Sequence, residues 1–399
     1  MYSAEKIKST YSIHNRVSLI KGGSPYFNAL FEIIDNAQKS IQLQVYIYEE
    51  DNTGLEVATH LMNAADRGIK VQVLLDGYAS SGLSNGFRKK LKNKGIQLRF
   101  FEPLLKSENF YFGRRLHHKI AVADGTIALV GGINISDRYN DVPGQSAWLD
   151  WAIRVEGEAA FELHTICNQF YAKKANDLIA LDRSSLMNSL DTNTYSPIRI
   201  RRNDWVKNKN EISASYMEML KNAENDIIIM SSYFIPGTFF KKNIINALNR
   251  GVNIKLILAG MSDLGIAKYA EKYLYRWAIR HGIEIYEYKN NVLHGKIAVS
   301  DKNFVTAGSY NINDISALAS VELNLDIQEN EFASHVNNTL REIIKNECVR
   351  ISPIKVIRSY SVAERLMQWL SYETFRLVFT LFTFYFRRNR KKLALNIFK

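Results

Sequence analysis

Residues 116–134 of the chain read LHHKIAVADGTIALVGGIN, and residues 293–311 read LHGKIAVSDKNFVTAGSYN. Both stretches contain a His-x-Lys, an Asp five residues after the lysine and then a Gly-x-x-Asn, at identical intervals. In a chain of ordinary composition, one His-x-Lys-x4-Asp arises by chance at roughly one position in ten thousand. Two aligned copies therefore indicate a duplicated functional site rather than two unrelated, half-exposed strands.

The similarity of the two halves extends beyond these motifs. Residues 36–48 match residues 222–234, where an amphipathic helix pattern runs into an apolar strand. Residues 67–75 match residues 250–258, where a glycine separates a helix from an alternating strand. Helices and strands that alternate in each half predict an α/β fold class, with helices on the faces of a sheet that is at least partly parallel.

The motifs themselves are expected to lie on strands, at residues 119–123 and 296–300. Side chains alternate between the two faces of a strand, so His117 and Lys119 should leave the same face. His118 should leave the opposite face, where we expect a structural or entrance role.

Composition restricts the class of protein. A chain of 399 residues is long enough for two domains of similar size. Its 46% hydrophobic and 23% charged side chains are typical of a folded globular protein. The formal charge of +12 points to a polyanionic partner, such as nucleic acid, an acidic lipid surface or a phosphorylated substrate. Only Cys167 and Cys348 could form a disulfide, so we expect a reducing compartment. Residues 1–15 contain no apolar run, so we expect neither a signal peptide nor a membrane span there.

We divide the chain into a first domain at 1–170, a connecting segment at 171–208, a second domain at 209–352 and a carboxy-terminal segment at 353–399. The connecting segment is polar and contains a basic run, which we interpret as solvated surface, with an anionic membrane contact as the alternative. The run consists of Arg199, Arg201, Arg202 and Lys207.

The carboxy-terminal segment combines aromatic and basic side chains. Residues 366–386 are rich in Phe and Leu, and residues 387–392 are mostly Arg and Lys. Aromatic rings settle at the depth of lipid headgroups and cations attract acidic lipids, so we interpret this segment as a helix lying in a membrane interface. Glu373 and Arg376 argue against a span, which needs about 20 predominantly apolar residues. A helix packed on the protein core and a true span are the alternatives.

The paired histidines and lysines suit the cleavage of a phosphodiester. Its anionic oxygens repel nucleophiles and its leaving group is poor, so a catalyst must neutralise charge and donate a proton. One neutral imidazole can attack phosphorus while the other, protonated, donates to the departing oxygen, which gives a phosphohistidine. His117 and His294 are the candidates for these two roles, and the symmetry of the two copies leaves open which of them attacks. We assign Lys119 and Lys296 to the non-bridging oxygens.

Other residues of the two motifs complete the predicted site, which requires no metal ion and no cofactor. Asn134, Asn311 and Ser309 are predicted to bind phosphate as hydrogen-bond donors. Asp124 and Asp301 complete the catalytic motif, but their place at the far end of the strand favours holding a turn or the domain interface.

Each imidazole also needs a partner on its second nitrogen to set its tautomer and orientation. Asp150 follows the first copy and Glu322 follows the second, each within a strand-like segment. We predict that these two residues are the orienting carboxylates; ordinary strand carboxylates are the alternative.

The doubled motif resembles the phospholipase D superfamily. Within it, the chain is most similar to bacterial cardiolipin synthases of the phospholipase D type, from about residue 18 to residue 346. The narrower features are Tyr46-Ile47-Tyr48, Gly131-Gly132-Ile133-Asn134, Trp148-Leu149-Asp150, Tyr233-Phe234-Ile235-Pro236 and Gly308-Ser309-Tyr310-Asn311. The resemblance implies two similar phospholipase D-like α/β halves, each a mixed sheet flanked by helices, with one active site at their interface.

The resemblance also implies an activity. A phosphatidyl group would pass from one phosphatidylglycerol to a hydroxyl of another and release glycerol, with His117 as nucleophile and His294 as acid and later base. The implied partners are phosphatidylglycerol, other anionic phospholipids and a membrane surface, without nucleic acid. The implied location is the bacterial cell membrane, with the chain peripheral on its cytoplasmic side.

Two departures from the family pattern affect these expectations. Many members begin with membrane-spanning helices that this sequence lacks, which makes the carboxy-terminal segment the candidate for membrane attachment. Gly132 stands where a serine is usual and so removes one hydroxyl contact with phosphate.

Other functions fit the same residues. A hydrolytic phospholipase D or another phosphodiesterase would use water in place of an alcohol. A nuclease would draw on the basic charge, although no aromatic and basic stacking segment flanks either motif. A non-catalytic scaffold would not need two intact copies. The choice between transfer and hydrolysis depends on the acceptor pocket, which the sequence does not describe.

Overall fold

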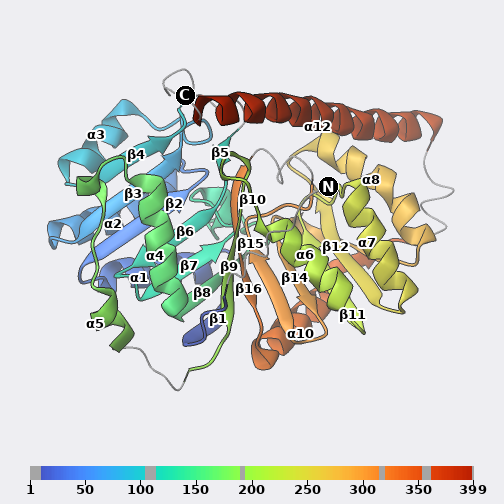
Figure 1. Ribbon diagram of the computed structural model, residues 1–399, viewed down its shortest axis with the longest axis horizontal. Helices are drawn as coiled ribbons and strands as arrows, with labels where there is room; N and C mark the ends of the chain where they lie inside the picture. The colour runs from blue at the N-terminus through green and yellow to red at the C-terminus, as the bar shows by residue number, and fades with distance from the viewer. Residues whose placement is uncertain (1–9, 104–113, 189–193, 314–319, 353–360, 398–399) are drawn as a thin grey trace.

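The computed structural model describes residues 10–103, 114–188, 194–313, 320–352 and 361–397. Each half of the chain builds one mixed sheet with helices packed on it, and the two sheets lie side by side (Figure 1). The predicted α/β fold class and the two-half architecture are confirmed.

The first sheet has seven strands in the order β1-β8-β7-β6-β2-β3-β4. Its β2, β3 and β4 are parallel, whereas β6, β7, β8 and β1 pair antiparallel. The strands are β1 (Asn15–Lys21), β2 (Ser40–Val45), β3 (Lys70–Asp76), β4 (Gln97–Phe101), β6 (Lys119–Ala123), β7 (Ile127–Gly131) and β8 (Trp151–Gly157).

The second sheet repeats this plan in the order β10-β9-β16-β15-β14-β11-β12-β13-β17. The short strand β5 (Arg115–Leu116) of the first half pairs in parallel with β16 and so joins the two halves. The strands are β9 (Ile198–Asp204), β10 (Lys209–Asn210), β11 (Asp226–Ser231), β12 (Asn253–Met261), β13 (Glu284–Val292), β14 (Ile297–Ser300), β15 (Phe304–Gly308), β16 (Ser320–Ile327) and β17 (Cys348–Arg350).

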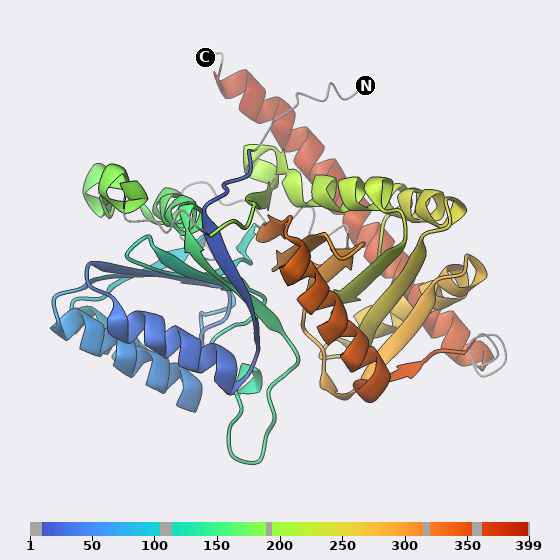
Figure 2. The same ribbon diagram turned by 90° about the horizontal axis from the view of Figure 1, so that it is seen from below.

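Helices cover the outer faces of both sheets. On the first sheet these are α1 (Ser24–Asn36), α2 (Asn52–Asp66) and α3 (Asn85–Asn93), and on the second they are α6 (Glu211–Asn222), α7 (Thr238–Asn249) and α8 (Gly265–Arg280). Figure 2 shows α1 and α2 in blue on the outer side of the first sheet. The short helix α5 (Arg183–Asn188) lies in the connection between the halves.

A central core fills the space between the two sheets. Helices α4 (Glu158–Tyr171) and α10 (Asn330–Glu347) pack there with the inner faces of both sheets, so one apolar cluster runs from Ile120 to Ile343 through both halves. Strands buried on both faces need apolar side chains or paired polar ones. β11 has a near-continuous hydrophobic run, whereas in β2 the buried Gln42 and Gln44 donate to Asn168 and to the carbonyl of Cys167. The two halves therefore form one unit around a shared core.

The predicted connecting segment at 171–208 is too long. Its last part forms β9, which pairs antiparallel with β16 as β1 pairs with β8, and so belongs to the second half. The basic run is not simply a solvated surface, because Arg199 contacts Asp326 at 2.9 Å and is mostly buried. Arg201 is also buried and donates to Ser215 at 2.8 Å.

The carboxy-terminal segment forms the long helix α12 (Val362–Ile397), which lies along one edge of the molecule and packs on α8 (Figure 1). Tyr372 of α12 stacks on Tyr273 of α8, with 4.8 Å between ring centroids. The side chains of the predicted basic cluster at 387–392 lie outside the described ones. In the described part of the chain, no helix combines the length and the hydrophobicity needed to cross a bilayer.

Candidate active site

The two motif histidines are fixed by backbone contacts that cross between the halves. The N–H groups of His117 and His118 donate to the carbonyl of Val321 at 2.9 and 3.0 Å. In the same way, the N–H groups of His294 and Gly295 donate to the carbonyl of Leu149 at 2.8 and 2.9 Å. The start of each motif strand is therefore fixed by hydrogen bonds to a backbone carbonyl of the opposite half.

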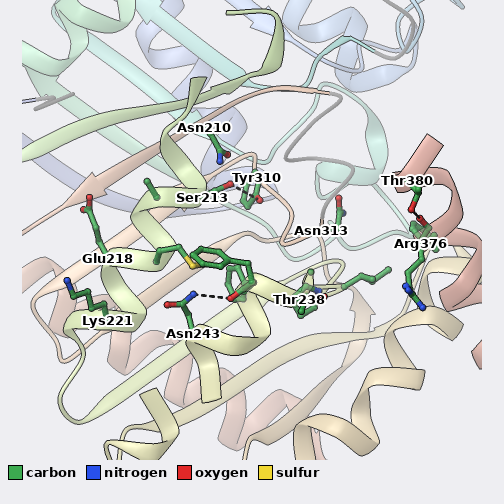
Figure 3. A pocket seen from close by; sticks show the side chains of 18 of the residues that line it. Asn210, Ser213, Glu218, Lys221, Thr238, Asn243, Tyr310, Asn313, Arg376 and Thr380 are labelled. Carbon is green, nitrogen blue, oxygen red and sulfur yellow. Dashed lines mark hydrogen bonds between the residues drawn. The ribbon is translucent and has the colours of Figure 1, made fainter. Parts of the chain in front are cut away.

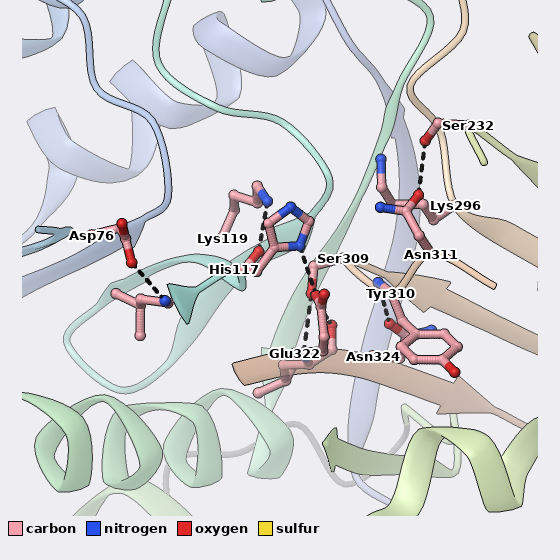
Figure 4. Close-up of polar contacts among 12 residues, drawn as sticks. Asp76, His117, Lys119, Ser232, Lys296, Ser309, Tyr310, Asn311, Glu322 and Asn324 are labelled. Atoms are coloured by element: carbon pink, nitrogen blue, oxygen red, sulfur yellow. Dashed lines mark hydrogen bonds and ion pairs between the residues drawn. The ribbon is translucent and has the colours of Figure 1, made fainter. Parts of the chain in front are cut away.

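Glu322 follows Val321 in the chain and Asp150 follows Leu149, so the same two segments also bring a carboxylate to each histidine. Glu322 Oε2 lies 2.9 Å from Nδ1 of His117 (Figure 4). Asp150 Oδ2 lies 2.6 Å from Nδ1 of His294. An ionised carboxylate only accepts hydrogen bonds, so each Nδ1 carries the proton and each Nε2 is left for chemistry. Both predicted carboxylates contact an imidazole, and each does so in the opposite half. Asp150 lies just before β8 rather than inside the strand.

The strand before His117 is held by a third carboxylate. Asp76, at the end of β3, accepts the N–H of Leu116 at 2.8 Å (Figure 4). Its side chain also accepts the N–H groups of Tyr78 and Ala79, each at 2.9 Å. The loop after β3 and the approach to His117 are therefore fixed by one buried group.

The two copies differ beside the carboxylates. In the second copy, Ser309 Oγ donates to Glu322 Oε2 at 2.5 Å and accepts the N–H of Leu323, so its hydroxyl supports the carboxylate that contacts His117. In the first copy, a Cβ on Gly132 would lie only 2.4 Å from Oδ1 of Asp150. The shorter Asp150 side chain occupies the space that the usual serine would fill.

Both lysines are buried next to their histidines. Lys119 Nζ donates to the carbonyl of His117 at 2.6 Å, and Lys296 Nζ donates to the carbonyl of His294. Burial lowers the pKa of Lys119 to about 7 and the pKa of Lys296 to about 8, although Glu322 and Asp150 oppose the change. Two desolvated ammonium groups in one site match the negative charge of a phosphodiester.

Burial also favours the neutral form of both histidines. It lowers the pKa of His117, and Glu322 opposes this effect. It lowers the pKa of His294 further, with Lys296 and Lys119 adding to the effect. Burial raises the pKa of Asp150 to about 6. An arriving phosphate anion would oppose the two lysines and so favour a protonated imidazole.

The two predicted phosphate-binding asparagines lie in different environments. The side-chain amide of Asn134 already makes hydrogen bonds on both sides: its Oδ1 accepts the N–H of Ile47 at 3.0 Å, and its Nδ2 donates to the hydroxyl of Tyr139 at 2.9 Å. Asn311 Oδ1 accepts from Ser232 at 3.0 Å, and its Nδ2 makes no hydrogen bond to any described residue (Figure 4). Asn311 is therefore the better placed of the two to donate to a phosphate oxygen.

Asp124 and Asp301 lie away from the histidines, at the far ends of the motif strands. Asp124 accepts three backbone N–H groups, from residues 38 to 40, at 2.8 Å each. Asp301 accepts three from residues 224 to 226, at 2.8 to 2.9 Å. Both carboxylates hold the turn before the first parallel strand of their own half, so the structure supports the turn-holding role and not a catalytic contact with phosphate.

Sequence reasoning missed the aromatic rings that enclose the imidazoles. Tyr46 meets His117 edge-on at 4.8 Å, and Tyr139 meets His294 edge-on at 5.2 Å. Tyr46 was visible only as part of the Tyr-x-Tyr family feature, and nothing in the repeat singles out Tyr139. His118 lies apart, with Nε2 2.8 Å from Gln44 Oε1 and its pKa lowered to about 3 by burial, which agrees with a structural role.

Comparisons with known proteins agree on one family. A sequence model described as "Cardiolipin synthase, PLD-like domain" matches residues 30–153 and 216–344. Cardiolipin synthase B of Salmonella typhimurium is 34% identical over 345 residues, which cover 84% of this chain and 82% of that protein. Cardiolipin synthase B of Escherichia coli K12 is 32% identical over 353 residues, which cover 86% and 84%.

A solved structure supports the fold independently. Phosphatidylserine synthase of Haemophilus influenzae Rd KW20 aligns over 93% of this chain and 97% of its own, with a TM-score of 0.74. The sequence identity is 14%, so this match concerns the fold alone.

Proposed function

Since the chain belongs to the phospholipase D-like cardiolipin synthase family, a family of phosphatidyltransferases, we propose that it joins two phosphatidylglycerol molecules into cardiolipin and releases glycerol. The observation that carries the proposal is the crossed arrangement of the site. Two imidazoles, each bound by a carboxylate of the opposite half, adjoin two buried lysines. This set matches the needs of a phosphodiester, which are a nucleophile, a proton donor and fixed positive charge.

In the first step, Nε2 of His117 attacks the phosphorus of one phosphatidylglycerol. Glu322 accepts the hydrogen bond from Nδ1 and stabilises the positive charge that develops on the ring. His294 donates the proton of its Nε2 to the departing glycerol oxygen, so the P–O bond breaks as the P–N bond forms. Lys119, Lys296 and Asn311 stabilise the non-bridging oxygens.

In the second step, the neutral His294 accepts a proton from the terminal hydroxyl of a second phosphatidylglycerol. That oxygen attacks phosphorus, the P–N bond breaks, and cardiolipin leaves with both imidazoles restored. Asp150 keeps the His294 ring in one orientation through both steps, which allows the same nitrogen to act first as acid and then as base.

The outward face of α12 supports a membrane location. Val362, Leu366 and Leu370 are 85%, 53% and 45% exposed, whereas Gln368 and Ser371 are 5% exposed and face the protein. A helix packed on a protein core would bury its apolar side instead. This reversed pattern disfavours the core-helix alternative and suits a helix that lies on a lipid surface.

Purified protein mixed with phosphatidylglycerol vesicles tests the proposal, with products resolved by mass. Cardiolipin and glycerol are the expected products. Phosphatidic acid and glycerol would instead identify a hydrolase, in which water resolves the phosphohistidine. Cleavage of DNA without any lipid turnover would overturn the lipid assignment.

A further inference from the structure

A cavity of about 980 Å³ lies between α6, α7, the loop before α7 and α12, on the outer side of the second half (Figure 3). Its volume is at the upper end of the range of about 300–1,000 Å³ that is usual for ligand pockets. Most of its lining is apolar and includes Met217, Ile235, Phe239, Phe240, Tyr310 and Phe375.

Nine of the nineteen described lining residues are polar or charged, and several of them already have partners within the protein. Tyr310 and Ser213 join their hydroxyls at 3.3 Å. The carboxylate of Glu218 is bound by Arg199 at 2.7 Å. Lys221 also lines the cavity, and its ammonium forms no ion pair with a described residue. The cavity therefore offers an apolar surface large enough for a hydrocarbon chain, together with the ammonium of Lys221.

The position of the cavity connects two features of the proposed function. One wall is α12, through Tyr372, Phe375 and Arg376, and the opposite side of that helix carries the exposed Leu366 and Leu370. The inner end contains Tyr310, the neighbour of Asn311 in the second motif copy. The same helix thus faces a lipid surface on one side and closes an apolar cavity on the other.

We propose that this cavity, here called the α12 groove, holds one acyl chain of a phospholipid taken from the membrane on which α12 lies. The inference rests on the proposed function, because it assumes a lipid surface beside α12. An acyl chain fits the apolar lining, needs no hydrogen-bond partners and enters from the side where the membrane would lie. Phe239, at 69% exposure, lies in the lining where such a chain would cover its ring.

Photocrosslinking tests the proposal directly. The full-length protein is mixed with phosphatidylglycerol vesicles that contain phosphatidylglycerol with a diazirine at the end of one chain, and crosslinked peptides are mapped by mass spectrometry. We expect crosslinks in residues 211–249, which include the groove residues of α6 and α7. Cardiolipin synthesis without crosslinks in these residues would overturn the groove and leave the proposed function intact.

A filled groove provides the matched comparison. Ala214 lies exposed on α6 and lines the groove, so Ala214→Trp places an indole inside it without changing the core. If the indole excludes about two methylene groups of the acyl chain from the groove, we expect about tenfold less crosslinking in Ala214→Trp than in the wild type. Asn246→Trp, on an exposed position of α7 outside the groove, is the control and should crosslink as the wild type does. Equal crosslinking of both variants would contradict the proposal.

Turnover separates the two possible sources of the chain. If the chain belongs to the substrate, Ala214→Trp raises KM for long-chain phosphatidylglycerol about tenfold and leaves a short-chain analogue unaffected. If the chain belongs to a neighbouring membrane lipid, Ala214→Trp lowers crosslinking and leaves KM unchanged for both long-chain phosphatidylglycerol and the short-chain analogue. Both results support an acyl chain in the groove.

Discussion

Glu322 Oε2 lies 2.9 Å from Nδ1 of His117, although the two residues are 205 positions apart and belong to different halves of the chain. The reciprocal contact joins Asp150 to His294 at 2.6 Å. Each half therefore contributes a histidine to the site and the carboxylate that orients the other half's histidine.

Replacing the proposed nucleophile should abolish turnover and leave the fold intact. His117→Ala should lower kcat by at least about ten-thousandfold, because no phosphohistidine can form. The measurement is cardiolipin formation, with circular dichroism to verify folding. His335→Ala, at an exposed position on α10, is the matched control and should retain activity. Wild-type activity in His117→Ala would refute the two-histidine mechanism.

The crossed carboxylates should affect different steps. A p-nitrophenyl phosphodiester has a leaving group that needs no proton, so Asp150→Asn should form the phosphoenzyme at a nearly normal rate. Glu322→Gln should slow this burst by about a hundredfold, because His117 loses its partner. The measurement is rapid-quench detection of the phosphoenzyme. Exchanged phenotypes would mean that the carboxylates pair within their own copies.

Restoring the usual serine in the first copy should be harmful. Gly132→Ser would push its Cβ against the Asp150 carboxylate, which also accepts the N–H of Trp151 at 2.8 Å. We expect a loss of about 1–3 kcal/mol in the free energy of unfolding and a lower kcat. Chemical denaturation and turnover measure these effects. Ser309→Ala is the companion variant and should lose about 1–3 kcal/mol, because it removes the hydrogen bonds with Glu322 and Leu323 and leaves buried groups unpaired.

Anion binding should weaken as the pH rises. Lys119 and Lys296, with pKa values of about 7 and 8, lose their protons through that range in the free protein. A bound anion raises both pKa values, so binding takes up protons near pH 8. Sulfate titrated by calorimetry, in buffers that differ in ionisation enthalpy, should show this uptake and weaker affinity at higher pH.

The same experiment has an internal control. Lys119→Gln should remove part of the proton uptake, because one of the two titrating groups is gone. An affinity that does not change between about pH 6 and 9 would contradict the assignment of both lysines to the anion.

The outward face of α12 should determine vesicle binding. Leu366→Glu combined with Leu370→Glu should weaken co-sedimentation with phosphatidylglycerol vesicles at least tenfold, since burying one leucine is worth about 1.5–3 kcal/mol. Activity on a short-chain soluble diester should persist. Leu178→Glu alters an exposed leucine outside α12 and should bind vesicles normally. Unchanged binding by the double variant would exclude this face as the membrane contact.

The sequence predicted the repeat, the motif strands and both carboxylates, because these depend on local spacing and alternation. It could not predict the crossing of the carboxylates, since Asp150 and Glu322 each follow the histidine of their own copy in the chain. Only the tertiary arrangement brings Leu149 and Val321 to the opposite histidines.

The strand β9 was missed for a related reason. Its arginines have the pattern of a solvated linker, yet Arg199 and Arg201 become largely buried when Asp326 and Ser215 are brought to them from other elements. A charged side chain is expected to be exposed only when no oppositely charged partner can reach it. The partner of Arg199 is Asp326, 127 positions away in the chain, so a local reading of the sequence does not find it.

The exchange of carboxylates across the centre also limits how such a chain can vary. Duplication often provides redundancy, so that one copy can drift while the other is kept. Here a change of Asp150 in the first copy is expected to impair the histidine of the second, and a change of Glu322 in the second to impair that of the first. We therefore expect that neither half works alone and that the two copies change together.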